Sequence, residues 1–279
     1  MNRTEKILFH IDKNGRGLEI GPSYNPVAPR KSGYKVHVID HLDRDALVSK
    51  YKKLGVGADL LRNIEEVDFI WQDQSYDDLT GKRKYYDWVI ASHVIEHTTD
   101  LIEFLNRCDR VLKDDGVLSL VVPDKRYCFD HYRPVTSLSK IIDSHLKPSR
   151  FHTPGTAAEF YLNVVSRGDK ILWSAKTEGQ YALAHSLDDA RRGMKSAAVA
   201  KAYEDFHAWC FSPQAFRLLI QDLFDLGLIP LRELQYFPTA GFEFFIALSR
   251  TGNGLAGSRL EMLDAIESEA MVNHERWAR

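Results

Sequence analysis

Short apolar runs alternate with amphipathic stretches along the first half of the chain. Runs rich in β-branched and aromatic residues predict buried strands, and apolar residues at helical spacing predict the helices that cover a sheet. The predicted strands are residues 17–20, 35–40, 66–71, 86–92 and 117–122. The predicted helices are residues 43–54 and a segment capped by Thr98 or Thr99, with an apolar face of Leu101, Ile102, Leu105 and Leu112. Strands that alternate with helices indicate an α/β fold with a largely parallel sheet.

The alternation stops at Pro123, where a polar and aromatic segment, residues 124–134, follows the end of a central strand. Open α/β sheets place their substrates at this edge. The next helical patterns are residues 137–146, 156–166 and 188–205. We therefore expect a helical insertion, about residues 126–210, that acts as a lid and keeps water away from the substrate.

The pattern of helix and strand returns after this insertion. Ser212 and Pro213 suit the N-cap and the first position of an amphipathic helix that ends near Gly227. Two apolar runs, residues 231–237 and 242–248, then predict a terminal β-hairpin that extends the sheet.

The composition is that of an ordinary globular protein, with 279 residues of which 44% are hydrophobic and 27% are charged. We expect one α/β domain with its insertion over residues 1–251. Residues 252–279 should form a linker and an accessory helix, which packs on the domain or on a second copy in a homodimer. A net charge of -2 and a pI near 6.6 give no electrostatic case for a nucleic-acid partner.

No apolar stretch reaches membrane-spanning length, and the N-terminal residues lack the apolar core of a signal peptide. The three cysteines, Cys108, Cys128 and Cys210, are isolated and lack the spacing of metal ligands. We therefore expect a cytoplasmic protein with no integral membrane segment.

The turn after the first predicted strand, Gly17-Leu-Glu-Ile-Gly-Pro-Ser-Tyr-Asn-Pro26, is a candidate cofactor loop. Gly21 lets a ligand come against bare backbone. A nicotinamide dinucleotide would need G-x-G-x-x-G and a following helix, whereas Pro22 removes a backbone donor and Pro26 argues against a full helix. Glu19 would repel a pyrophosphate but suits the cationic sulfonium and amino groups of S-adenosylmethionine. The loop therefore favours that cofactor, and a buried strand with a proline-stiffened turn is the alternative.

Two further strand ends carry carboxylates. Asp40 ends a β-branched run about twenty residues beyond the first strand, where α/β nucleoside sites place an acid that accepts both ribose hydroxyls. An aspartate that begins a surface turn is the alternative there. Asp73, in Gln72-Asp-Gln74, could accept a hydrogen bond from an adenine amino group.

Glu96 and His97 are candidate acid–base or metal-binding residues, because they follow a polar strand end. Side chains of adjacent residues on a helix point about 100° apart, so we expect the pair not to converge on one ion. We interpret the pair as structural and predict no metal site.

Taken in order, several motifs resemble those of the class I S-adenosylmethionine-dependent methyltransferases, and within them the broad type 11 group. The motifs are Leu18-Glu-Ile-Gly21, Val38-Ile-Asp40, Asp73, the run from Tyr86 to His97 and the run from Val111 to Leu118. Together they cover roughly residues 15–125. One departure is that Pro22-Ser-Tyr-Asn-Pro26 replaces the usual second and third loop glycines, so the helix after this loop is expected to be lost.

The resemblance implies S-adenosylmethionine as cofactor and a Rossmann-like seven-stranded sheet, mostly parallel, with its last strand antiparallel. The residues that it places around the cofactor are Glu19 and Gly21 near the methionine part, Asp40 on the ribose, Asp73 on the adenine, and Ser92 and His93 near the sulfonium. Pro22 and Gln74, which adjoin these positions, complete the predicted cofactor-binding set.

A methyltransferase holds its acceptor in line with the methyl group, and a hydroxyl acceptor usually needs a base. His207 and His131 are the candidate bases, and Asp124 is a candidate for orienting a base or binding substrate. Packed structural histidines are the alternative. Relatives with a comparable helical insertion are often associated with polysaccharide and secondary-metabolite pathways, so the resemblance favours O-methylation of a sugar or glycan-precursor hydroxyl. The other hypotheses are N-methylation of a small amine, a nicotinamide oxidoreductase and a non-catalytic scaffold.

Overall fold

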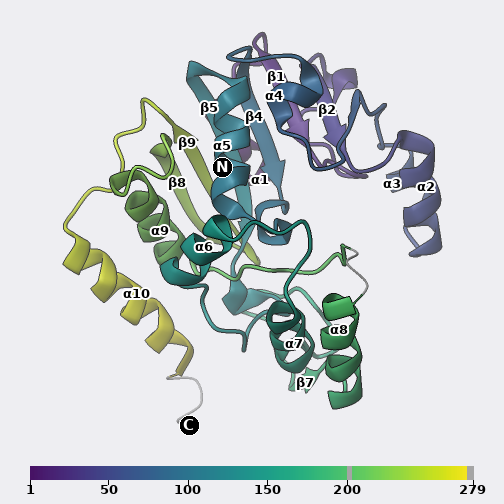
Figure 1. Cartoon of the computed structure of the whole chain (residues 1–279), viewed down its shortest axis with the longest axis vertical. Coiled ribbons are helices and arrows are strands. Elements are labelled where there is room, and N and C mark those ends of the chain that lie inside the picture. The colour runs from purple at the N-terminus through teal and green to yellow at the C-terminus, as the bar shows by residue number, and fades with distance from the viewer. Residues whose placement is uncertain (200–202, 275–279) are drawn as a thin grey trace.

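The computed structural model describes residues 1–199 and 203–274, and its centre is a seven-stranded sheet (Figure 1). The strand order is β3-β2-β1-β4-β5-β9-β8. These strands are β1 (Arg16–Ile20), β2 (Lys35–Asp40), β3 (Phe69–Ile70), β4 (Tyr86–Ser92), β5 (Leu112–Pro123), β8 (Arg232–Ala240) and β9 (Glu243–Ser249). Strands β1 to β5 are parallel, and β9, the last in sequence, is antiparallel to β5 and β8. The predicted fold class is therefore confirmed.

The helices of this part of the chain differ in how they contact the sheet. They are α1 (Arg3–Ile7), α2 (Arg44–Lys53), α3 (Ala58–Leu61), α4 (Tyr76–Thr80), α5 (Leu101–Val111) and α9 (Pro213–Asp225). The larger apolar core joins the sheet to α5 and α9, and Leu105, Leu120 and Phe216 are fully buried in it. A smaller core includes Ile7 of α1 and Trp88 of β4, and α2 and α3 form a separate apolar cluster around Leu47 and Leu61.

The connection from β1 to β2 contains one 3₁₀ turn, η1 (Arg30–Ser32), and no α-helix. We expected no helix in this connection, because the prolines of the loop resist helix formation. Val27 and Ala28 of the loop are buried in the smaller core with Ile7 and Trp88. The loop thus supplies apolar cover that a helix would otherwise give.

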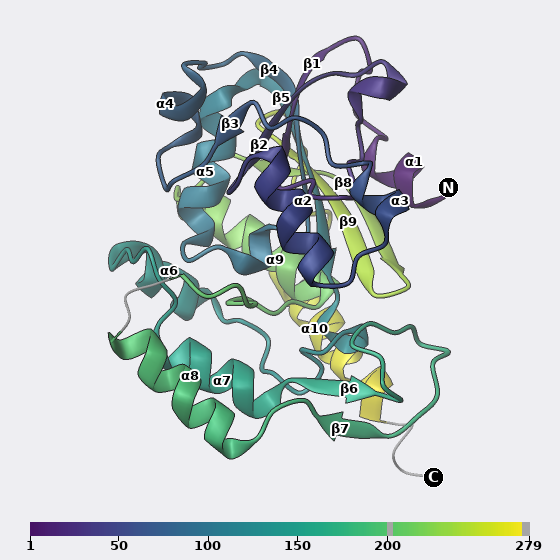
Figure 2. The ribbon, with the colours of Figure 1, turned by 90° about the vertical axis from the view of Figure 1, so that its right-hand side faces the viewer.

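The chain between β5 and α9 forms a layer at one end of the sheet (Figure 2). Its elements are α6 (Leu138–Leu146), α7 (Pro154–Asn163), β6 (Val165–Arg167), β7 (Tyr181–Leu183) and α8 (Leu187–Val199). The helix predicted to reach residue 166 ends at Asn163, because Val165 pairs with Leu183 in a two-stranded sheet that we did not predict. The helix predicted over 188–205 ends at Val199; residues 200–202 lie outside the described residues, and residues 203–205 are not helical.

Two predicted boundaries near the centre of the sheet are wrong. Asp100, not Thr98 or Thr99, caps α5, because its carboxylate accepts a hydrogen bond from the Glu103 backbone N–H at 2.9 Å. The helix ends at Val111, and β5 begins at Leu112. Strand β3 is also shorter than predicted, since only two of its residues pair with β2.

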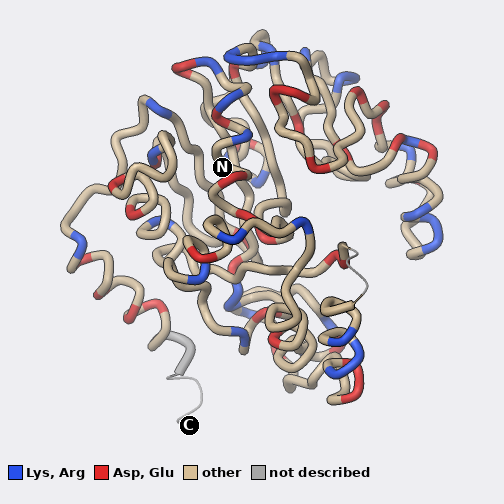
Figure 3. The backbone as a smooth tube through the Cα atoms, in the orientation of Figure 1, with Lys and Arg blue, Asp and Glu red and all other residues tan. Residues whose placement is uncertain are grey.

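The C-terminal helix α10 (Arg259–His274) packs on α9 of its own chain. Its Glu269 accepts a hydrogen bond from the Gln214 backbone N–H at 3.1 Å, and Arg259 forms an ion pair with Asp222. Figure 3 shows basic and acidic residues mixed along the elements, in agreement with the small net charge. Among the described residues, no helix is both long and apolar enough to cross a lipid bilayer.

Gly17 tests how tightly the first strand packs. A Cβ at this position would lie 2.0 Å from the Trp88 ring, whose indole N–H is held by the Asp12 carbonyl at 3.0 Å. Gly17→Ala should therefore lower the free energy of unfolding in urea by about 1–3 kcal/mol through overpacking. Gly57→Ala is the control, because no atom lies within 4 Å of its added Cβ. Equal stabilities of the two variants would contradict this packing.

Candidate active site

The carboxyl ends of the parallel strands bring several predicted site residues to one edge of the sheet. Gly21 follows β1, Asp40 ends β2 and Ser92 ends β4. Glu243, the first residue of the antiparallel β9, reaches the same edge, because it pairs with Pro123 at the end of β5. Open α/β sheets bind their ligands at this edge.

Glu19 is buried, with an exposed fraction of 2%, and holds the loop after β1. One carboxylate oxygen accepts a hydrogen bond from the Val27 N–H at 2.6 Å, and the other accepts from the Ala28 N–H at 3.2 Å. Burial raises the pKa of Glu19 to about 7, against the opposing effect of these two backbone donors. The placement of this side chain near the methionine part of the cofactor stays a prediction, and the structure shows that Glu19 holds the loop.

Gly21 and Pro22 leave the loop with few backbone N–H groups that are free to bind a ligand. Gly21 has a φ of 62°, in the region that favours glycine, and its N–H donates to the Ile39 carbonyl at 2.8 Å. A Cβ there would lie 3.1 Å from Val94 Cγ2. Pro22 has no N–H. This turn therefore suits a ligand without phosphate groups better than a pyrophosphate.

Asp40 offers an unused acceptor at the end of β2. Its side chain is buried, and Oδ1 lies 2.8 Å from the His41 backbone N–H and 2.6 Å from His41 Nδ1. Oδ2 is buried and receives no hydrogen bond from any residue that the structure describes. A buried acceptor without a donor is costly, so this oxygen is suited to a hydroxyl of a bound ligand.

Asp73 and Gln74 are engaged with other parts of the protein. Asp73 has a φ of 81°, and its carboxylate lies 2.6 Å from Arg150 Nε and 3.6 Å from Arg107 Nη1. Gln74 Oε1 accepts a hydrogen bond from the Gln72 backbone N–H at 2.6 Å. The structure therefore places Asp73 at the end of β3, tied to the insertion through Arg150.

Ser92 and His93 belong to a network that also includes the first helix. Arg3 donates to Ser92 Oγ at 3.0 Å and to Glu243 Oε1 at 2.7 Å. His93 Nε2 lies 2.8 Å from Glu243 Oε2, and its Nδ1 lies 3.3 Å from Glu96 Oε1. Burial lowers the pKa of His93, but the two glutamates outweigh it and raise this pKa to about 9. His93 is accordingly a cation at neutral pH.

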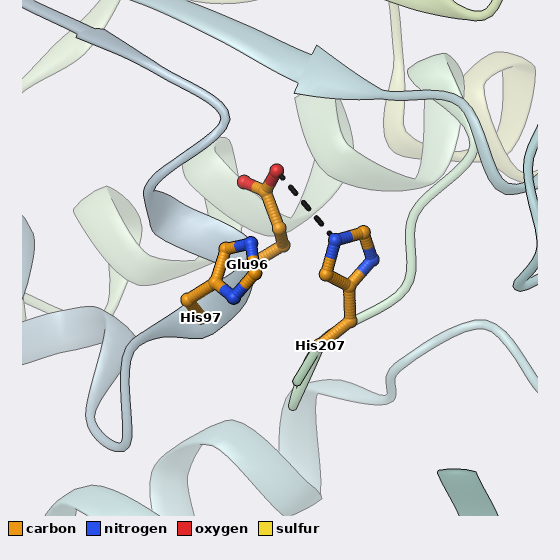
Figure 4. A group of neighbouring side chains, drawn as sticks. All are labelled: Glu96, His97 and His207. Atoms are coloured by element: carbon orange, nitrogen blue, oxygen red, sulfur yellow. Dashed lines mark ion pairs between the residues drawn. The ribbon is translucent and has the colours of Figure 1, made fainter. Parts of the chain in front are cut away.

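Glu96, His97 and His207 form a compact cluster next to this network (Figure 4). Glu96 and His97 lie on η2 (Ile95–His97), and His207 comes from the segment before α9. One potential ligand atom from each residue lies within 4.8 Å of the others. Our expectation that Glu96 and His97 diverge is therefore wrong, because His207 lies across from both and the turn is not a regular α-helix.

His207 is held in place by Asp130. Its Nδ1 lies 2.5 Å from Asp130 Oδ2, while Asp130 Oδ1 accepts from the buried Arg133 at 2.8 Å. Burial raises the pKa of Asp130, but His207 and Arg133 outweigh it and lower this pKa to about 2. The ionised Asp130 can accept a hydrogen bond from Nδ1 of His207, and Nε2 of the same ring lies 4.0 Å from Glu96 Oε1.

The structure does not bring the other two predicted catalytic residues to His207. The His131 ring stacks on Tyr181 with centroids 4.7 Å apart, and its Nδ1 lies 2.9 Å from the Arg126 carbonyl oxygen. Asp124 accepts hydrogen bonds from Arg126 and, at 2.6 Å, from Thr239 Oγ1. These contacts give both residues structural partners.

A surface depression of about 430 Å³ borders the cluster. Its lining combines hydroxyl, charged and aromatic side chains, among them Thr99, Ser139, Lys140, Asp143, His152 and Trp209. Ala208 and Trp209, which follow His207, and Thr99, two residues beyond His97, belong to this lining, whereas Glu96, His97 and His207 do not. Most of the lining comes from the insertion.

The sequence analysis missed several charged residues that complete the site: Arg3, Asp130, Asp205 and Glu243. Asp130 lies in the polar segment 124–134 that we predicted to face substrate, so a signal for it was present. Arg3 and Glu243 are separated by 240 residues, and no local pattern connects them.

Residues 2–156, more than half of the chain, match a family model described as a methyltransferase domain. A search of curated proteins gives no match. Among solved structures, the chain is similar to an S-adenosylmethionine-dependent methyltransferase from Aquifex aeolicus, with 13% identity, 88% of each chain covered and a TM-score of 0.41. It is also similar to the CcbJ methyltransferase from Streptomyces caelestis, with 11% identity, 89% of this chain and 96% of that chain covered, and a TM-score of 0.42. Such remote likenesses carry no argument about function.

The family match shows that this chain belongs to the methyltransferase domain family. The predictions of a class I methyltransferase, of an enzyme and of S-adenosylmethionine as its cofactor are confirmed. The alternatives of a nicotinamide oxidoreductase and of a non-catalytic scaffold are set aside.

The buried carboxyl of Glu19 should make stability depend on pH. Its pKa in the folded protein, about 7, lies above the usual value near 4.5, so between these values the folded state holds a proton that the unfolded state has lost. Stability should therefore fall as pH rises from about 4.5 to 7, by on the order of 1–3 kcal/mol. Urea unfolding of Glu19→Gln should lack this part of the slope. The exposed Glu267→Gln variant should keep it, and identical pH profiles for all three proteins would contradict the assignment.

Proposed function

We propose that this methyltransferase transfers its methyl group to a hydroxyl of a small polar acceptor, with a sugar or glycan precursor as the substrate class. The observation that carries the proposal is that the carboxyl edge of the sheet offers both an unused buried acceptor, Asp40 Oδ2 at the end of β2, and an oriented imidazole, His207, near Glu96 after β4. The first suits the ribose of the cofactor, and the second suits activation of a hydroxyl.

The residues at the ends of β1 and β2 fit S-adenosylmethionine, which supplies the electrophilic methyl group when bound. Asp40 would accept hydrogen bonds from the ribose hydroxyls, since charge-assisted bonds of this kind satisfy its free oxygen. Gly21 would let the cofactor lie against the backbone. Glu19 would keep the loop in shape and add negative charge near the cationic end of the cofactor.

Ser92 and His93 would lie near the sulfonium, as the resemblance implies. A protonated His93 alone would repel that cation. Glu96 and Glu243 flank His93, and Arg3 pairs with Glu243, so positive and negative charges balance in this group. The balance makes this strand end compatible with a positively charged cofactor.

We assign activation of the acceptor hydroxyl to His207. Its Nδ1 is fixed by Asp130, so Nε2 is the nitrogen that can receive a proton. As the proton leaves, the hydroxyl oxygen becomes the nucleophile that attacks the methyl carbon. His131 and Asp124 are not needed for this step, because their partners belong to the surrounding framework.

The polar lining of the depression beside His207 supports a sugar as the acceptor. Hydroxyl groups of Thr99 and Ser139 and the charged Lys140 and Asp143 offer hydrogen bonds to a polyhydroxyl ligand. Trp209 adds an aromatic ring to the same lining. The insertion contributes most of this surface, so it would cover the acceptor as the lid that we expected.

Asp40→Asn tests the cofactor site. The variant replaces the unused carboxylate oxygen and should weaken binding of S-adenosylmethionine by about 1–3 kcal/mol, through lost charge-assisted hydrogen bonds. Calorimetric titration measures the change, with S-adenosylhomocysteine as a second ligand and NAD as a ligand that should not bind comparably. Asp45→Asn, a highly exposed position on α2, is the matched control. Unchanged affinity in Asp40→Asn would remove this residue from the site.

His207→Ala tests the acceptor chemistry against His131→Ala. Loss of the activating group should lower turnover by roughly 10²–10⁴-fold while leaving the affinity for S-adenosylmethionine almost unchanged. The assay follows S-adenosylhomocysteine release with a panel of activated sugars and, in parallel, small amines. His131→Ala should stay close to wild type. Near-normal turnover of His207→Ala, or activity with amines alone, would favour N-methylation instead.

A further inference from the structure

Glu96 is a buried carboxylate without a hydrogen-bond donor. Its exposed fraction is 0%, and neither oxygen receives a hydrogen bond within the part of the chain that the structure describes. Buried charges in proteins are paired with cations or bind metal ions, since an isolated charge is strongly disfavoured away from water. The nearest cationic side chain is His93, with Nδ1 3.3 Å from Oε1, and that imidazole also contacts Glu243 through Nε2.

Two further imidazoles face this carboxylate (Figure 4). His207 Nε2 lies 4.0 Å from Glu96 Oε1, and the ligand atoms of Glu96, His97 and His207 are all within 4.8 Å of one another. Atoms that share a zinc ion at about 2.0–2.2 Å lie about 3–3.5 Å apart. Small side-chain rotations would therefore close the three groups around one ion.

A carboxylate lies beside Nδ1 of each histidine of the cluster. His207 Nδ1 lies 2.5 Å from Asp130 Oδ2, and His97 Nδ1 lies 2.9 Å from Asp205 Oδ1. With Nδ1 beside a carboxylate, Nε2 of each ring is the nitrogen left for Glu96. Histidines that bind metals usually have this arrangement, in which the second nitrogen faces a carboxylate that sets the tautomer and the ring orientation.

We propose that Glu96, His97 and His207 bind one divalent first-row transition-metal ion of the kind represented by Zn²⁺ and Mn²⁺. Two imidazole nitrogens and one carboxylate oxygen form a donor set that such ions accept, with further positions open to a substrate. Magnesium and calcium prefer oxygen ligands, so this set disfavours them. Ala208 and Trp209, which follow His207 in the chain, line the depression described above.

The role of this ion, unlike its binding, rests on the hydroxyl acceptor of the proposed function and replaces the assignment of His207 as the base. An acceptor hydroxyl bound to the ion would release its proton to water more readily. Its oxygen would then form the bond to the methyl carbon, while the carbon–sulfur bond breaks and its electron pair stays on sulfur. His207 would act as a ligand of the ion in this case and not as the proton acceptor.

The test uses the full chain after removal of metals with a chelator. Calorimetric titration with Zn²⁺ or Mn²⁺ should show one bound ion per chain, and added Co²⁺ should give the visible absorption of a coordinated ion. His97→Gln and His207→Ala should weaken ion binding by on the order of 100-fold or more, and Asp130→Asn, which removes a carboxylate that pairs with both His207 and Arg133, by about 10–100-fold. His131→Ala, outside the cluster, should bind the ion as the wild type does. Circular dichroism and S-adenosylmethionine binding show that each variant is folded.

The outcomes separate this inference from the proposed function. Failure of the folded wild type to bind Zn²⁺, Mn²⁺ or Co²⁺, or equal binding by all variants, would overturn the metal site. Ion binding that the cluster variants weaken, without methylation of any hydroxyl, would support the site and count against the proposed acceptor. Full hydroxyl methylation by a protein that binds no ion would overturn the site and leave the proposed acceptor standing.

Discussion

The buried Glu19 carboxylate accepts hydrogen bonds from the backbone N–H groups of Val27 and Ala28. The sheet edge at which we propose that the cofactor binds depends on these two bonds. These bonds fix the loop between β1 and β2, where we predicted that the usual helix is lost. Apolar residues of this loop join α1 in covering the sheet. The short strand β1 thus supplies the anchor of the loop that follows it. Loss of the anchor would expose apolar surface and release Gly21, which turns the chain at the edge.

A second set of buried charges continues from this edge toward the insertion. Arg3, Glu243, His93 and Glu96 follow one another with alternating charge and join the first helix, the antiparallel strand and the end of β4. Alternation of this kind keeps each buried charge next to an opposite one. This series of paired charges ends at Glu96, because neither of its oxygens accepts a hydrogen bond from a described residue.

The insertion contributes an imidazole and several charged side chains to the carboxyl edge of the sheet. Asp130 orients His207, Asp205 faces His97, and Arg150 reaches Asp73 at the end of β3. Polar residues of the same insertion line the depression beside the two histidines. In the proposed function the sheet edge would hold the cofactor and the added layer would form the acceptor surface, as in many α/β enzymes.

The sequence by itself determined the alternation of strands and helices, the loss of the helix after β1 and the position of Asp40 at a strand end, because each depends on residues close together in the chain. Periodicity, proline chemistry and turn spacing are local properties. Only the tertiary structure decided the ends of α5 and α7, where caps and strand pairing competed with helix propensity. The convergence of Glu96, His97 and His207 is also a tertiary fact. Docking of the insertion on the sheet edge brings residues 97 and 207 together. Local helical geometry around Glu96 does not predict that contact.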